Sequence, residues 1–413
     1  MASSFRFGLA PMEGVTDLPF RLWMSMASDP AMTCTPFLRV TSTYPARFPL
    51  EFAPELHELR GQVRYQLLPQ LMAAQAEDFV RVAKPLLQHS SVVELNCGCP
   101  APNAVGSGAG SSLLKAPDQF RQFLLTSLEQ VGASNLAVKM RLGFEDSGEF
   151  DGLLSRLKDL PLKQLTIHGR TRKDRYSAYA RWDLIRAAGE YLDFPVIGSG
   201  DILGWRSVQE RQDQLHSVHD ILIGRGALRN PWIFILLRQQ KEELRLPSSV
   251  LPDSLTVYAL LVELYRKRFP DLMNFVASGA FLTPCLDVAE RWTEIRDQLM
   301  ILNFGHMDRH HLENLDRGIL GRVKLIWNYL RSSLPDAFFA PKILRMNHIG
   351  EFFAAISQLC DESSDIVVSH RAEYDWIYTS DKKPPGDYPS FAGKFTPAFQ
   401  QRSQQPLYSD QWA

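Results

Sequence analysis

The sequence has few cysteines and no excess of either charge. Its 413 residues include five cysteines, at positions 34, 97, 99, 285 and 360, and no two of them form a Cys-x-x-Cys pair. This spacing argues against zinc-ribbon and thioredoxin-type motifs, so we expect free cytosolic thiols and no metal site. The formal net charge is −1. Any contact with nucleic acid would therefore need a local basic surface rather than a global field.

The chain also lacks long apolar runs and a secretory leader. No stretch reaches the roughly 20 apolar residues that span a bilayer. The first four residues lead directly into a strand candidate, without the apolar segment of a signal peptide. We therefore expect a cytoplasmic, soluble protein that does not contact membranes, and we expect it to be a monomer.

Short apolar segments alternate with helical patterns over the first 245 residues. Eight strand candidates cover residues 5–10, 35–40, 63–68, 92–95, 136–140, 164–167, 195–197 and 220–223. Eight strand–helix repeats over roughly 230 residues are typical of a (β/α)8 barrel. The sequence therefore predicts an α/β fold, with a TIM barrel over residues 1–245 as the catalytic domain.

The pattern changes in the last third of the chain. Four segments between residues 253 and 360 carry apolar residues at i, i+3 and i+4, which predicts a smaller all-α domain. Residues 361–413 have little periodicity and are rich in Pro, Ser, Gln and Tyr. We expect an extended, irregular C-terminal tail there.

Two glycine-containing segments follow the seventh and eighth strand candidates. They are Gly198-Ser199-Gly200-Asp201 and Gly224-Arg225-Gly226. The loops after these two strands of a barrel commonly bind phosphate, because their backbone N–H groups can approach an anion closely. The segments therefore predict a phosphorylated cofactor, although two structural turns with a solvated Arg225 would give the same pattern.

Polar residues at other strand ends suggest which cofactor this is. Lys139 and His168 would lie beneath the phosphate, where a lysine could stabilise the negative charge of a reduced flavin mononucleotide (FMN). Gln66 could bond the pyrimidine edge of the flavin. Pro11, Met12 and Glu13, after the first strand, could line its ring. Taken alone, His168 could equally be a core histidine.

Cys97 and Cys99 follow the strand candidate at residues 92–95. A disulfide between them is unfavourable, because residues two apart in an extended chain hold their side chains apart. A metal site lacks further ligands at a fitting spacing. A reactive thiol and an inert thiol both remain open, with Cys99 the freer of the two because it lies between Gly98 and Pro100.

Two basic segments could contact RNA. The first runs from Arg170 through Arg172 to Tyr176, and the second lies in the helical domain and includes Lys324 and Arg331. Cations and aromatic rings together suit phosphate neutralisation and base stacking. Each segment could also be no more than a solvated face.

Several ordered segments resemble the tRNA-dihydrouridine synthases, most of all the bacterial C-type enzymes. The matching segments are 10–17 (Ala-Pro-Met-Glu-Gly-Val-Thr-Asp), 37–40 (Phe-Leu-Arg-Val), 66–68 (Gln-Leu-Leu), 95–100 (Leu-Asn-Cys-Gly-Cys-Pro), 138–143 (Val-Lys-Met-Arg-Leu-Gly), 168–173 (His-Gly-Arg-Thr-Arg-Lys), 223–228 (Ile-Gly-Arg-Gly-Ala-Leu) and 322–331 (Arg-Val-Lys, four residues, Tyr-Leu-Arg). The resemblance implies reduction of a uridine in tRNA by FMN, which NADPH or NADH recharges. It favours a uridine of the D-loop, by analogy position 16.

The same resemblance implies roles for individual residues. Cys99 would be the general acid that protonates uracil C5 while hydride arrives at C6. The uracil would be held by Asn96, Arg141 and Tyr176, with Arg39 as a further candidate. The basic segments and the helical domain would hold the folded tRNA.

Two positions depart from the family pattern. Ser199 stands where the family usually has asparagine, and Asn103 stands where lysine is common. Segments 281–311 and 361–413 exceed the C-type pattern. Two alternatives therefore stay open: an FMN barrel oxidoreductase that acts on a small pyrimidine or enone, and an RNA-binding protein that has lost catalysis.

Overall fold

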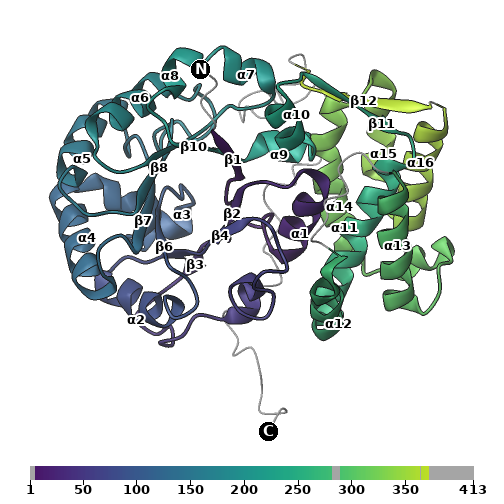
Figure 1. Cartoon of the computed structure of the whole chain (residues 1–413), viewed down its shortest axis with the longest axis horizontal. Helices are drawn as coiled ribbons and strands as arrows, with labels where there is room; N and C mark the ends of the chain where they lie inside the picture. The colour runs from purple at the N-terminus through teal and green to yellow at the C-terminus, as the bar shows by residue number, and fades with distance from the viewer. Residues whose placement is uncertain (1–4, 281–288, 363, 372–413) are drawn as a thin grey trace, which may run out of the picture.

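The computed structural model describes residues 5–280, 289–362 and 364–371. It contains a ring of parallel strands enclosed by helices, with a group of further helices beside the ring (Figure 1). Each strand pair in the ring is parallel, and the first strand pairs with the last. The predicted barrel is confirmed.

Two of the eight barrel strands are interrupted. The second is divided into β2 and β3 around Pro36, and the third into β4 and β5 at Pro69, which has no N–H to donate. Because β2 pairs with β4 and β3 pairs with β5, both halves of each strand stay in the ring. The strands are β1 (Arg6–Leu9), β2 (Met32–Cys34), β3 (Leu38–Arg39), β4 (Gln66–Leu68), β5 (Gln70–Met72), β6 (Val93–Cys97), β7 (Leu136–Arg141), β8 (Gln164–His168), β9 (Val196–Ser199) and β10 (Asp220–Ile223).

The third strand continues four residues beyond its predicted end. Since β5 follows Pro69, Gln66 lies at the amino end of the strand, where its side chain is exposed. Gln70 instead occupies the carboxyl half of the strand and is fully buried. The prediction that Gln66 lies at the cofactor end of the barrel is therefore wrong.

Most of the helices that follow the barrel strands cover the outside of the ring (Figure 1). Asp17 is the N-cap of the first helix and accepts a hydrogen bond from the N–H of Phe20 at 3.3 Å. Pro117, which has no N–H to donate, is the first residue of the helix that ends at Val131. The helices around the barrel are α1 (Leu18–Ser28), α2 (Ala76–Leu86), α3 (Pro102–Gly106), α4 (Pro117–Val131), α5 (Phe150–Leu157), α6 (Trp182–Tyr191), α7 (Trp205–Gln209), α8 (Gln212–Leu215), α9 (Arg225–Arg229) and α10 (Ile233–Gln239).

The remaining helices pack around one buried helix, α11. It contacts α1 of the barrel as well as α13, α14 and α16, and Trp23 of α1 donates to the carbonyl of Ser254 at 2.9 Å. In the described part of the chain, no helix is both long and apolar enough to cross a membrane. The helices of this region are α11 (Val250–Lys267), α12 (Phe269–Phe275), α13 (Ala289–Phe304), α14 (Arg317–Leu330), α15 (Pro341–Arg345) and α16 (Ile349–Asp361).

A two-stranded antiparallel sheet joins the barrel to the end of the helical region. β11 (Glu243–Pro247) follows the last barrel helix and pairs with β12 (Asp365–Ser369). The helical region is thus bordered by strands, and the segment predicted to be irregular begins with a strand. The sequence pattern gave no sign of this pairing, because the partners lie more than 100 residues apart. The rest of the predicted tail, residues 372–413, lies outside the described residues.

Candidate active site

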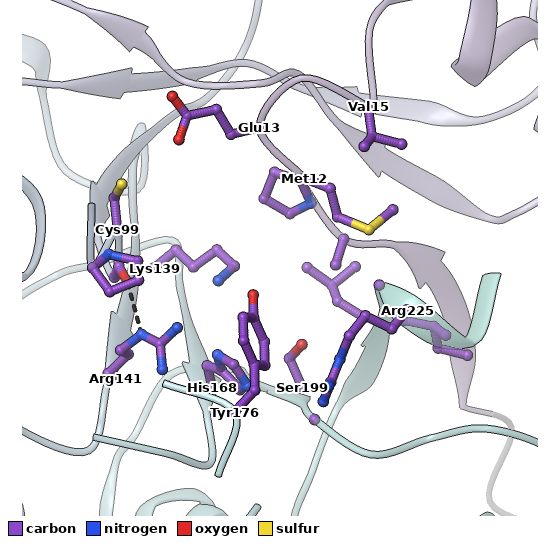
Figure 2. Close-up of a pocket in the computed structure, with 18 of the residues that line it drawn as sticks. Met12, Glu13, Val15, Cys99, Lys139, Arg141, His168, Tyr176, Ser199 and Arg225 are labelled. Carbon is purple, nitrogen blue, oxygen red and sulfur yellow. Dashed lines mark hydrogen bonds between the residues drawn. The ribbon is translucent and has the colours of Figure 1, made fainter. Parts of the chain in front are cut away.

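A cavity of about 590 Å³ opens at the carboxyl ends of the barrel strands. Its walls come from loops after β1, β6, β8, β9 and β10, and from the end of β7. Cys99 and Arg141 lie on one side and Arg225 on the other, while Lys139 and Tyr176 point into the space between them (Figure 2). The volume is within the usual range of small-molecule and cofactor sites, roughly 300–1,000 Å³.

The turn that carries Cys99 is held by a side-chain amide. The Oδ1 atom of Asn96 accepts hydrogen bonds from the backbone N–H groups of Gly98 and Cys99, both at 3.0 Å. Its Nδ2 atom donates to Oε1 of Gln70 at 2.8 Å. On the other side of the turn, Nε of Arg141 donates to the carbonyl of Gly98 at 2.8 Å. The turn after β6 is therefore fixed by three neighbouring strands.

The Cys99 thiol lies at the edge of the cavity and is 7% exposed. Burial raises its pKa, and the nearby carboxylate of Glu13 adds to the rise. The backbone hydrogen bond from Ala101 lowers the pKa, as do the charges of Arg141 and Lys139, but the net pKa is above the ordinary value. The thiol is therefore protonated at neutral pH and has a proton to give. Cys97, two residues earlier, is completely buried in the apolar layer outside the barrel.

The segment after Cys99 packs directly behind it. Ser111 donates to the carbonyl of Cys99 from its N–H at 3.2 Å and from Oγ at 2.9 Å. Gly110 has a φ of +60°, and a Cβ atom there would meet the carbonyl oxygen of Cys99 at 3.0 Å. A side chain at position 110 would thus disturb both the backbone and the placement of Cys99.

Lys139 stands above a buried carboxylate inside the barrel. Glu94 is completely buried, accepts from Thr166 Oγ1 at 3.0 Å, and is also hydrogen-bonded by Gln70. Burial lowers the pKa of Lys139, while the charge of Glu94 acts in the opposite direction. Burial also raises the pKa of Glu94. The arrangement places an ammonium group at the floor of the cavity, with a counter-charge below it.

His168 is a neutral base in this environment. Burial lowers its pKa well below the ordinary value, and the cations Arg141 and Lys139 lower it further. Its Nε2 atom lies 3.2 Å from a guanidinium nitrogen of Arg170. Because a guanidinium can only donate, Nε2 is the acceptor and the proton of the neutral ring is on Nδ1.

The loops after β9 and β10 meet at a cluster of charges. Asp201 binds Arg170 at 2.6 Å and Arg225 at 3.1 Å. The guanidinium of Arg225 also lies 4.4 Å from the ring centre of Tyr176. Gly200 has a φ of +130°, and a Cβ atom there would collide with Ala180. Two cations share one carboxylate, so this end of the cavity has positive charge for a phosphate.

Most of the predicted site residues line this one cavity. They are Pro11, Met12, Glu13, Asn96, Cys99, Lys139, Arg141, His168, Tyr176, Ser199, Gly200, Asp201, Gly224 and Arg225.

Four other predicted residues lie near the barrel but outside this lining. Gln66 borders a separate surface hollow at the amino end of its strand. Arg39 is exposed and donates to the carbonyl of Asn103 at 3.3 Å. Arg170 is buried against Asp201, and Arg172 lies over the ring of Phe144 at 4.8 Å. Of these, Arg170 serves the cavity indirectly, because it holds the Asp201 loop.

The two predicted RNA contacts on α14 and just after it are not surface residues. Lys324 is 7% exposed and donates to the carbonyl of Met346. Arg331 is 1% exposed, lies 4.2 Å from the ring centre of Phe339, and donates to Oδ1 of Asn328 at 2.9 Å. The sequence predicted that both residues contact RNA, and their burial argues against that contact. The sequence pattern shows that a helix has a basic face but not what packs against it.

Two buried residues of the site were missed. Glu94 was read as part of an apolar strand, and Gln70 was hidden by the similar Gln-Leu pattern four residues earlier. A buried glutamate between apolar neighbours is itself a signal, since carboxylates are rarely buried without a partner. In the described ranges, no group of three or more His, Cys, Asp or Glu residues is placed to hold a metal ion.

Known proteins with similar sequences carry one activity in their names. The family model described as "Dihydrouridine synthase (Dus)" matches residues 8–279. The tRNA-dihydrouridine(16) synthase of Yersinia pestis is 36% identical over 231 residues, covering 54% of this chain and 73% of that protein. The enzyme of the same name from Escherichia coli K12 is 32% identical over 250 residues, covering 59% and 78%.

Solved structures with a similar arrangement are more distant. The crystal structure of TcOYE with pHBA has a TM-score of 0.42 at 10% identity and covers 57% of this chain and 88% of that one. Morphinone reductase has a TM-score of 0.43 at 11% identity, covering 58% and 87%.

The family match runs from within β1 to beyond the last barrel helix and includes each barrel loop that lines the cavity. Many of the residues by which the sequence resembled this family, among them Cys99, Lys139 and Arg225, lie together around one cavity. The chain belongs to the dihydrouridine synthase family, whose members are flavin-dependent oxidoreductases.

Proposed function

We propose that this protein reduces a uridine of tRNA to 5,6-dihydrouridine, with FMN as cofactor and NADPH or NADH as the source of electrons. The observation that carries the proposal is the position of two groups on one cavity. A protonated thiol, Cys99, lies at its edge and an ammonium group, Lys139, at its floor. By analogy with the relatives, the target is position 16.

The residues around the cavity fit FMN. The cationic end formed by Arg225, Gly224 and Gly200 suits a phosphate. Lys139 lies deeper, where its charge would favour the anionic reduced form of an isoalloxazine ring. Met12 lies across the cavity from Lys139 (Figure 2), and Pro11, in the same loop, also lines the cavity, so this loop supplies an apolar wall. When bound, the flavin would supply the hydride that is added at C6 of uracil.

The chain itself supplies the proton and the geometry. Hydride at C6 leaves negative charge on C5 and the adjoining carbonyl, and the Cys99 thiol can give its proton to C5. Asn96 and Arg141 hold the turn that carries this thiol, so its sulfur has little freedom to move. The raised pKa of Cys99 keeps the proton on sulfur until it is needed.

RNA would approach from the loop between β8 and α6. Lys173 and Arg175 are exposed there, and Tyr176 and Tyr179 present their rings at the same loop. Cations for phosphates and aromatic faces for bases are what an unstacked nucleotide requires. The target uridine must leave its stacked position, at a cost of a few kcal/mol that is smaller in a loop.

The test is direct. Purified protein, FMN and NADPH are incubated with a tRNA transcript that carries no modifications, and the digested RNA is analysed by mass spectrometry. We expect a gain of two hydrogens at one D-loop uridine, and no gain in a transcript with cytidine at that position. Flavin reduction with no change in tRNA would contradict the proposal and favour an oxidoreductase that acts on small molecules.

A further inference from the structure

Helix α14 presents one face to the barrel, and two of its residues reach barrel loops. Arg322 and Tyr329 are seven residues apart, so they lie two turns from each other on the same side of the helix. Arg322 binds Asp17 at 2.9 Å and donates to the hydroxyl of Tyr258 at 2.8 Å. Asp17 caps α1, directly after the loop whose Met12 and Glu13 line the cavity.

Tyr329, the second of these residues, enters the cavity wall. It is the one residue of the helical region, as far as the structure describes it, that lines the cavity. α14 packs against α9, whose first residue is Arg225. The phenol therefore comes to the end of the cavity where Arg225 lies over Tyr176. The same helix thus contacts the loops after β1 and β10, which are neighbours in the barrel.

The electrostatic surroundings keep the Tyr329 hydroxyl a donor. Burial raises its pKa, and Tyr176 raises it further, while Arg225 acts in the opposite direction. The group is neutral and protonated at physiological pH. A protonated phenol can donate to an anion without adding charge of its own.

The barrel alone offers a phosphate limited charge at this end. Arg170 and Arg225 share Asp201, so the three groups together carry one net positive charge. A phosphate monoester carries about −1.5 to −2 at pH 7. Neutral donors, such as the backbone N–H groups of the glycine loops and a nearby hydroxyl, can meet the rest of its demand without further charge.

We propose that the hydroxyl of Tyr329 donates a hydrogen bond to the phosphate of the bound flavin, so that the helical region completes the cofactor site. This inference rests on the proposed FMN chemistry. It assigns to α14 a binding role inside the cavity, in place of the exposed RNA-binding face that the sequence suggested.

The test compares two flavins on a conservative variant. Tyr329→Phe keeps the ring in the wall and removes only the hydroxyl. Dissociation constants for FMN and for riboflavin, which has no phosphate, are measured by fluorescence quenching. Tyr191→Phe is the matched control, since Tyr191 is an exposed residue at the end of α6 that packs under Lys158.

We expect Tyr329→Phe to bind FMN about five- to tenfold more weakly, and riboflavin with unchanged affinity. Tyr191→Phe should match the wild type for both. Equal weakening for the two flavins, or no weakening for either, would overturn the inference and leave the proposed function standing. If the wild-type protein itself binds no FMN, the proposed function fails as well. That outcome is distinct from the others because it is seen without any substitution.

Discussion

The side-chain oxygen of Asn96 accepts the backbone N–H of Cys99 at 3.0 Å, and the same side chain donates to Gln70 at 2.8 Å. Asn96 was predicted to hold the uracil. In the structure its amide is engaged with the turn that carries the proposed acid. Its contribution to the reaction therefore includes the placement of the thiol, whatever contact it makes with the substrate.

Asn96→Ala should lower dihydrouridine formation by about 100-fold and leave flavin bound. Two backbone N–H groups lose their acceptor, so the turn loosens, and a displacement of about 1 Å at a reacting group costs about that much in rate. The measurement is single-turnover oxidation of the reduced flavin by tRNA. Asn135→Ala is the control, because Asn135 also bonds the backbone through its side chain, donating to the carbonyl of Val131, but does so just before β7 and away from the cavity. Equal rates for the two variants would show that the Asn96 bonds do not position the thiol.

Lys139→Met should keep the flavin and make its reduced form less stable. The substitution removes the ammonium group at the cavity floor and leaves a side chain of similar length. Loss of about 1.4 kcal/mol of charge stabilisation lowers a two-electron potential by about 30 mV. Spectroelectrochemical titration of the flavin measures the shift. An unchanged potential would place the anionic part of the flavin away from Lys139.

The neutral state of His168 predicts a dependence of stability on pH. Its pKa in the folded protein is well below the ordinary value of 6.5, so between these two values the unfolded chain binds a proton that the folded protein does not. The contribution of His168 to the free energy of unfolding should therefore be constant above pH 6.5. It should fall as the pH decreases below that, by up to about 1.4 kcal/mol per pH unit.

Urea unfolding of the flavin-free protein at pH 5.5 and pH 7.5 tests this. His168→Gln removes the titrating group, so the loss of stability between the two pH values should be smaller in the variant than in the wild type. If both proteins lose the same amount, His168 does not have a lowered pKa.

Removal of Arg331 should lower the stability of the protein, whereas removal of Lys173 should weaken tRNA binding. Arg331→Ala should lower the free energy of unfolding by about 2 kcal/mol, because the buried guanidinium packs on Phe339 and bonds Asn328. Lys173→Ala should leave stability unchanged, since its pairing with Glu145 is at the surface. Lys173→Ala should instead weaken tRNA binding two- to fivefold. The slope of the logarithm of the binding constant against the logarithm of the salt concentration should become shallower by about one, as expected for the loss of one phosphate contact. A stable Arg331→Ala protein that binds tRNA poorly would contradict the buried placement.

The sequence was most informative where local pattern and chemistry agree. The alternation of strands and helices predicted the barrel, and Cys99, Lys139 and Arg225 were found because each follows or ends an apolar strand. Those positions share one face in any parallel barrel, so no knowledge of packing was needed to bring them together.

The errors have physical causes. Gln66 was assigned to the cofactor because the third strand was predicted to end at residue 68, whereas it continues past Pro69 to Met72. Lys324 and Arg331 were assigned to RNA because helical spacing defines faces without showing which face is covered. The pairing of β11 with β12 depends on segments that are distant in sequence, which local periodicity cannot reveal.

The account depends most on Cys99 as the proton donor. Cys99→Ala, loaded with FMN and reduced by NADPH, is incubated with unmodified tRNA, and the target nucleotide is analysed by mass spectrometry. We predict that the variant binds and reduces flavin as the wild type does, and that the uridine gains no hydrogens. Dihydrouridine formed at the wild-type rate by Cys99→Ala would contradict the account.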